Sequence, residues 1–159
     1  MVRQIYYGRP GFGGSLSPGV KWLLIANFGV YLIQTFAGRE LIYLFGLNPA
    51  AFWSEKVFWQ PLTYMFLHGG MFHLLFNMLA LWIFGGTLES VWGTTRFIRF
   101  YFIVGIGAGL SNCLLTPGMG VPIIGASGAV YGLLAAYGIL FPESIIYIYG
   151  LFPLKAKYL

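Results

Sequence analysis

The sequence predicts an all-α protein built as a bundle of transmembrane helices, and three observations support that fold class. Hydrophobic residues make up 58% of the 159-residue chain and charged residues 8%, against about 25% charged residues in an ordinary soluble domain. Four stretches have about the length of apolar sequence that a helix needs to cross a bilayer. Basic residues fall mainly on one side of these stretches. A soluble chain of this size could not cover its surface with so few charges.

The elements follow in order along the chain. Residues 1–19 are predicted to form a cytoplasmic N-terminal segment rich in glycine. The predicted spans are residues 20–37, 62–88, 97–115 and 122–141. Between the first two, residues 38–61 combine large aromatic side chains with prolines and charges. Trp and Tyr concentrate at membrane interfaces, so we expect an interfacial loop there instead of a further crossing.

The basic residues predict the orientation. Seven of them flank the spans on one side (Arg3, Arg9, Lys21, Arg96, Arg99, Lys155, Lys157), and two lie on the other (Arg39, Lys56). Cytoplasmic loops are enriched in Lys and Arg, so the N-terminus is expected in the cytoplasm and the protein in the plasma (inner) membrane. This topology accounts for the net charge of +5 without a nucleic-acid partner. The lone Cys113 is expected to be a packing residue.

Polar residues inside the second and fourth spans indicate a functional site. His68, His73 and Asn77 interrupt an otherwise apolar run, and Ser127 stands between Gly125 and Gly128. His73 and Asn77 are four residues apart and therefore share one helix face. Polar groups in a span are costly and usually face an internal cavity. Because spans two and four both start on the outer side, these groups share one depth in the outer half of the bilayer, where a serine with amide and imidazole donors suits acyl transfer.

The pattern His68-x4-His73-x3-Asn77, then Gly85-Gly86-x-x-Glu89 and Gly-x-Ser-Gly at 125–128, resembles the rhomboid family of intramembrane serine proteases. The likeness runs from the aromatic first loop to the end of the chain. It implies a rhomboid-like fold and an endopeptidase that cuts transmembrane proteins near the outer membrane surface. No cofactor and no metal are expected, and the partners are membrane lipid and transmembrane substrates.

The resemblance also implies roles for individual residues. Ser127 would be the nucleophile, and His73 and Asn77 would form the oxyanion hole with the Ser127 amide. His68 would support the oxyanion site or the path of water. Tyr131, one turn below the serine, would pack against the catalytic imidazole.

Each residue also has a simpler interpretation. A serine in a membrane helix often bonds only to its own backbone. Gly128-x3-Gly132, continued by Ala136, is a small-residue pattern that permits close helix packing, a role compatible with the catalytic one. His68 at a helix start is consistent with an interfacial residue, and Glu89 is expected to pair with Arg96 or Arg99.

The chain departs from the rhomboid pattern at the general base. In that family the base is a histidine on a sixth span, whereas the two histidines here precede the serine and the chain contains no aspartate. We expect the 159 residues to be the first four spans of a longer product, incomplete at the C-terminus and inactive alone. Two alternatives stay open: an inactive homologue that binds membrane clients, or a base recruited from His68, His73 or a lysine. A membrane chaperone or transporter ranks last, because neither requires Gly-x-Ser-Gly at a matching depth.

Overall fold

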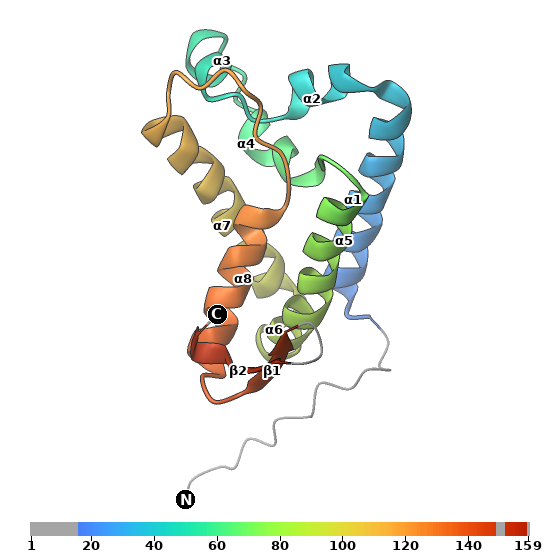
Figure 1. Ribbon diagram of the computed structural model, residues 1–159, viewed down its shortest axis with the longest axis vertical. Coiled ribbons are helices and arrows are strands. Elements are labelled where there is room, and N and C mark those ends of the chain that lie inside the picture. Colours follow the sequence, from blue (N-terminus) through green and yellow to red (C-terminus); the bar gives the residue numbers. More distant parts are fainter. Residues whose placement is uncertain (1–15, 149–151, 159) are drawn as a thin grey trace, which may run out of the picture.

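The computed structural model describes residues 16–148 and 152–158 (Figure 1). Three long helical segments and one shorter helix pack into a bundle. They are α1 (Pro18–Ala37), the continuous segment from α5 (Met71–Ala80) through the π-helical η2 (Leu81–Gly85) to α6 (Gly86–Trp92), α7 (Thr94–Leu115) and α8 (Ser127–Leu140). The first three are long and apolar enough to cross a membrane, and α8 is a shorter apolar helix.

Short elements gather at the two ends of the bundle. At the upper end of Figure 1 lie α2 (Arg39–Phe45), α3 (Pro49–Ser54) and α4 (Gln60–Thr63) with the 3₁₀ turn η1 (Tyr64–Phe66). At the lower end a small antiparallel hairpin pairs β1 (Ile145–Ile148) with β2 (Phe152–Lys155), followed by η3 (Ala156–Tyr158). The sequence pattern did not predict this hairpin, because the apolar residues after α8 look like the approach to another helix.

The helix boundaries differ from the predicted spans most at the second span. The long helix begins at Met71, not Leu62, and continues to Trp92. Leu67 and Gly70 are extended, with ψ of 147° and 168°, and they separate η1 from α5. Residues 62–66 are as apolar as the helix that follows, so hydropathy alone could not reveal the break between them. Composition likewise missed the short helices within 38–61.

The other boundaries shift less. α1 begins at Pro18, α7 at Thr94, and α8 at Ser127 instead of Pro122. Proline at the first position suits a helix start because its missing N–H has no partner there anyway. Of the predicted N-terminal segment, residues 1–15 lie outside the described part of the chain.

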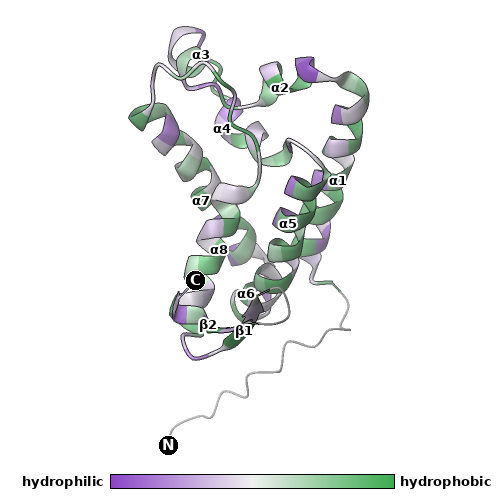
Figure 2. Cartoon of the chain, viewed as in Figure 1, coloured by the Kyte–Doolittle hydropathy of each residue, from purple (hydrophilic) through white to green (hydrophobic). Residues whose placement is uncertain are grey.

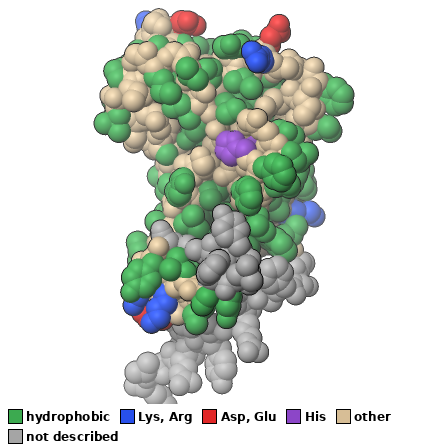
Figure 3. All heavy atoms as spheres, viewed as in Figure 1, with side chains coloured by type: hydrophobic (Ala, Val, Ile, Leu, Met, Phe, Trp, Pro, Cys, Tyr) green, Lys and Arg blue, Asp and Glu red, His purple; other side chains and the backbone are tan. Residues whose placement is uncertain are grey.

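The outer surface of the bundle is apolar, as expected for an integral membrane protein. Large hydrophobic side chains stay exposed along the helices, among them Leu32 (61%), Ile103 (70%) and Ile139 (79%). Figure 2 shows hydrophobic residues along each of the long helical segments, and in Figure 3 the charged side chains in view lie mainly toward the upper and lower ends of the molecule. A soluble monomer does not expose apolar area on this scale, whereas a bilayer solvates it.

Small residues bring α7 and α8 together. A methyl group added at Gly128 would lie 2.7 Å from Cβ of Ala108, and one added at Gly132 would overlap Val104. Both partners are on α7. The predicted packing face of the serine helix is therefore confirmed at Gly128 and Gly132. Close backbone approach of this kind supplies van der Waals contact where lipid offers no competing hydrophobic drive.

The expected pairing of Glu89 with Arg96 or Arg99 is wrong. The Glu89 carboxylate accepts hydrogen bonds from the Gly19 and Val20 N–H groups (2.8 and 2.9 Å) and from the Ser17 and Thr94 hydroxyls (2.6 Å each). It therefore caps the N-terminus of α1 from α6, a position where a helix has unpaired N–H groups and favours negative charge. The ion pairs among the described residues join Glu143 to Lys155 and Lys157, and hydrogen bonds from these lysines lower the pKa of Glu143 to about 2.

Candidate active site

The extended segment between η1 and α5 brings the two histidines together. His68 lies in the extended stretch between η1 and α5, and His73 lies in the first turn of α5. Their rings meet edge to face with centroids 5.1 Å apart. His68 is fully buried, and neither of its ring nitrogens has a hydrogen-bond partner among the described residues. His68 is therefore a buried neighbour of His73 inside the protein. His73 is half-buried.

A backbone hydrogen bond favours one of the two tautomers of His73. The Gly69 N–H donates to Nδ1 of His73 at 3.3 Å. A nitrogen that accepts cannot hold a proton, so the neutral ring is protonated at Nε2. Nε2 is then a hydrogen-bond donor.

The donors of His73 and Asn77 converge on Gly125. A Cβ built on Gly125 would lie 2.8 Å from Nε2 of His73 and 3.8 Å from Nδ2 of Asn77. The Asn77 amide nitrogen is buried and has no partner among the described residues. Gly125 has φ of 122°, a region that favours glycine. Glycine is required here both by this backbone angle and by the close approach of the imidazole.

The loop that leads to Ser127 is tied to the short helices at the upper end. Leu47 and Ile123 exchange two backbone hydrogen bonds of 2.9 and 2.7 Å, and the Gly125 N–H donates to the Tyr64 carbonyl at 2.9 Å. The Tyr64 hydroxyl in turn donates to the Gly105 carbonyl of α7 at 2.7 Å. These contacts fix the backbone two residues before Ser127.

Ser127 differs from other hydroxyl side chains in the helices of this chain. Ser54, Ser111 and Thr116 each donate to a carbonyl four residues earlier. Ser127 is the first residue of α8, is half-buried, and makes no such bond within the described residues. Its N–H is one of the groups that the first turn of a helix leaves without an internal partner. The simpler interpretation, a serine satisfied by its own helix, does not describe this residue.

Tyr131 lies on the open side of α8. Tyr131 is 72% exposed, and within the described residues its ring makes no aromatic contact with His68 or His73. The role expected for Tyr131, as a support for a catalytic imidazole, has no partner among residues 16–148 and 152–158. No cluster of three metal-ligating side chains occurs in the same part of the chain.

Sequence reasoning missed Gln34. Its carboxamide bonds both the N–H and the carbonyl of His68, directly before the start of α5 (3.1 and 2.6 Å). A signal was present, because Gln34 is a polar residue inside an apolar span, the same feature that drew attention to His68.

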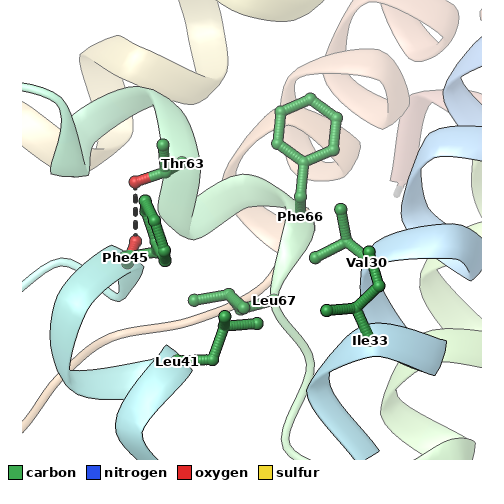
Figure 4. A pocket seen from close by; sticks show the side chains of 7 residues that line it. All are labelled: Val30, Ile33, Leu41, Phe45, Thr63, Phe66 and Leu67. Atoms are coloured by element: carbon green, nitrogen blue, oxygen red, sulfur yellow. Dashed lines mark hydrogen bonds between the residues drawn. The ribbon is translucent and has the colours of Figure 1, made fainter. Parts of the chain in front are cut away.

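An apolar pocket of about 230 Å³ opens beside this region, between α1, α2 and η1 (Figure 4). Its lining residues are Val30, Ile33, Leu41, Phe45, Thr63, Phe66 and Leu67. The Thr63 hydroxyl donates a hydrogen bond to the Phe45 carbonyl at 2.7 Å. The pocket includes none of the proposed catalytic side chains, and it borders the His68 segment through Leu67.

Comparison with known proteins identifies the family. A model of the Rhomboid domain matches residues 55–159. The chain is 36% identical over 97 residues to the rhomboid protease GluP of Bacillus subtilis. The aligned region covers 61% of this chain and 18% of GluP. It is 35% identical over 120 residues to the chloroplastic rhomboid-like protein 11 of Arabidopsis thaliana, an alignment that covers 74% of this chain and 40% of that protein. It is 32% identical over 137 residues to the mitochondrial presenilin-associated rhomboid-like protein of Mus musculus (81% and 35%). The chain thus spans less than half of the length of these relatives.

Proposed function

Because the chain belongs to the rhomboid family, we propose that it is the nucleophile-bearing part of an intramembrane serine endopeptidase. One observation carries this proposal. Two donors, Nε2 of His73 and the unpaired Nδ2 of Asn77, point at a glycine two residues before a serine whose hydroxyl has no partner among the described residues. A buried amide donor without an acceptor is costly, so its presence favours a ligand that supplies the acceptor.

The chemistry follows from these groups. Ser127 Oγ attacks the carbonyl carbon of the scissile peptide, and its proton passes to a general base. The carbonyl oxygen becomes an oxyanion that accepts hydrogen bonds from His73, Asn77 and the Ser127 N–H. The tetrahedral intermediate then expels the amine, which takes the proton from the base, and water hydrolyses the acyl-enzyme by the same route.

The general base is proposed to be a histidine outside these 159 residues. His73 cannot serve while its Nδ1 accepts from Gly69 and its Nε2–H donates to the oxyanion. His68 is buried behind His73. The exposed ring of Tyr131, one turn after Ser127, provides a surface on which an incoming imidazole could pack.

The substrates are proposed to be transmembrane proteins, and the active site to open toward the outer side of a plasma membrane. Basic residues flank the spans opposite to the site. Arg96 and Arg99 lie at the start of α7, while Ser127 follows the loop after the other end of that helix. This arrangement supports a cytoplasmic N-terminus.

A second candidate is a rhomboid-like protein that binds membrane clients without cutting them. The observation in its favour is that the two histidines of the chain pack against each other at the proposed oxyanion hole, so neither is placed to act as a general base. It shares the fold and the client class with the protease, and it differs in lacking a reactive serine.

Labelling and cleavage separate the two candidates. The full-length protein, in lipid vesicles, is treated with a serine-directed fluorophosphonate and with a single-span substrate. The protease should be labelled at Ser127 and should cleave, with Ser127→Ala abolishing both. Ser111→Ala is the matched control, because that hydroxyl is exposed and bonded to the Gly107 carbonyl of its own helix. Client binding that survives Ser127→Ala, without labelling of the native protein, would support the second candidate.

A further inference from the structure

We infer that Gln34 of α1 is a positioning residue for the oxyanion site, acting by clamping the main chain of His68. The inference rests on the proposed function, because it assigns Gln34 to the site that holds His73 and Ser127. Gln34 does not itself reach the reacting atoms. It acts through the backbone that leads into α5.

The clamp consists of two hydrogen bonds to one residue. Gln34 Nε2 donates to the His68 carbonyl at 2.6 Å, and the His68 N–H donates to Gln34 Oε1 at 3.1 Å. A carboxamide presents a donor and an acceptor side by side, as a neighbouring β-strand does. Aspartate, glutamate, lysine and apolar residues cannot make both bonds when in their usual charge state.

The clamp satisfies backbone groups that the fold leaves without partners. His68 lies between η1 and α5 in extended backbone, outside either helix. It is fully buried, so water cannot take over its N–H and carbonyl. The residues directly before Gln34 and His68 in the sequence, Ile33 and Leu67, both line the apolar pocket (Figure 4). Hydrogen bonds are electrostatically stronger in such surroundings, and unpaired groups cost more.

The consequence reaches His73 through one peptide. Fixing the His68 carbonyl fixes the peptide plane that it shares with the Gly69 N–H. That N–H donates to Nδ1 of His73 and so keeps the proton on Nε2, which faces Gly125. The His68 ring also rests against the His73 ring. Gln34 therefore holds both the tautomer and the orientation of the imidazole that donates to the oxyanion.

Gln60 provides a matched control. Gln60 is buried, whereas Gln34 is half-buried, and it likewise bonds backbone groups near the upper end: the Asn48 N–H donates to it at 2.9 Å, and it donates to the Leu44 carbonyl at 3.4 Å. Its partners lie in α2 and just before α3, not in the His68 segment. A general loss of packing would appear in both glutamine variants, whereas loss of positioning would appear only at Gln34.

The test measures the His73 tautomer directly in the full-length protein. Imidazole ¹⁵N spectra are recorded for the native protein, Gln34→Met, Gln34→Glu and Gln60→Met, with His73→Gln used to assign the signals. Native His73 should show a protonated Nε2 and an unprotonated Nδ1. Gln34→Met preserves the volume and removes both bonds, so the second tautomer should appear. Gln34→Glu keeps only the bond from the His68 N–H and sets a second acceptor against the His68 carbonyl, so the second tautomer should appear there too. Gln60→Met should lower the melting temperature and leave the tautomer unchanged.

Reaction at Ser127 gives the second readout. Gln34→Met should slow fluorophosphonate labelling of Ser127 by about tenfold to a hundredfold per folded molecule, because small displacements of catalytic groups cost that much. An unchanged His73 spectrum in both Gln34 variants would overturn the inference. Should Gln34→Met fail to fold, Gln34→Glu decides alone by the same criterion. Absence of labelling in the native protein would instead refute the proposed function, and the tautomer result would still stand by itself.

Discussion

At the scale of single residues, the polar side chains inside the bundle divide into two kinds. Glu89 and Gln34 bond to backbone groups through both of their terminal polar atoms, and they hold α1 at its two ends. The Asn77 amide nitrogen and both ring nitrogens of His68 have no partner among the described residues. Unpaired buried polar atoms are rare in native structures because each costs about 1–3 kcal/mol. The amide nitrogen of Asn77 lies where the proposed oxyanion would supply the missing acceptor.

Replacing Gly125 with alanine should abolish Ser127 labelling. The added Cβ would lie 2.8 Å from the His73 ring, and φ of 122° is strained for any residue with a side chain. We expect a loss of at least about a hundredfold in labelling rate, since the imidazole must move. Gly118→Ala is the control in the same loop, because a Cβ there meets nothing within 4 Å. Equal labelling rates for the two variants would contradict the proposed geometry.

Replacing Glu89 with glutamine should destabilise the protein. Two N–H groups and two hydroxyls donate to the native carboxylate, and a glutamine amide turns one acceptor into a competing donor. Leaving buried donors unpaired should cost about 2–4 kcal/mol, measured as a lower free energy of unfolding in detergent. Glu143→Gln is the control, since its carboxylate is exposed and its two ion pairs are open to solvent. A stability loss at Glu143 as large as that at Glu89 would argue against the tertiary cap.

At the scale of helices, the serine helix depends on small residues. Gly128 and Gly132 of α8 face Ala108 and Val104 of α7, and Gly105 of α7 leaves room for Met65 and Ala129. The same contact that stabilises the bundle sets the distance of α8 from its neighbours. The contact between α7 and α8 therefore both stabilises the bundle and determines where Ser127 lies.

Replacing Gly132 with leucine should disrupt the α7–α8 interface. Overpacking usually costs about 1–3 kcal/mol, and a whole side chain opposite Val104 should reach the top of that range or exceed it. The melting temperature and Ser127 labelling should fall together. Gly107→Leu on α7 is the matched control, because a Cβ on that glycine meets nothing within 4 Å. If leucine is tolerated equally at both positions, the interface does not depend on Gly132.

At the scale of the whole molecule, the charge distribution and the exposed apolar side chains indicate that the ends of the bundle face water and its middle faces lipid. The charged side chains in view lie mainly toward the ends of the molecule, while hydrophobic ones are spread over its whole length (Figure 3). The short helices at the upper end hold the loop of Ser127, while the Glu143 ion pairs tie the hairpin at the lower end. Site and hairpin are thus at different depths of one bundle.

The 159-residue chain by itself should not cleave membrane substrates. It has the nucleophile and oxyanion donors of the proposed site, but both histidines are engaged there. Loss of general-base assistance costs about 10²–10⁴-fold in rate. A gel assay with a single-span substrate should show cleavage by the longer protein that contains a downstream histidine, and none by residues 1–159. Ser127-dependent cleavage by the short chain would instead identify His68 or His73 as the base.

The sequence alone determined that this is a membrane protein and which polar residues, from His68 to Ser127, form the candidate site. Low charge content, apolar runs of bilayer length and the pattern from His68 to Ser127 are local or compositional properties, so they can be read without coordinates. The family followed from the spacing of these same residues, and the domain match at 55–159 agrees with it.

Only the tertiary structure decided how the polar groups pair. Hydropathy did not distinguish residues 62–66 from α5, because an extended break at Leu67–Gly70 changes backbone geometry without changing polarity. It did not reveal that Glu89 binds the start of α1, or that Gln34 binds His68, because these partners are 69–72 and 34 residues apart. A buried polar group binds the unpaired backbone atom that folding brings nearest, and that choice depends on how the helices pack, not on their periodicity.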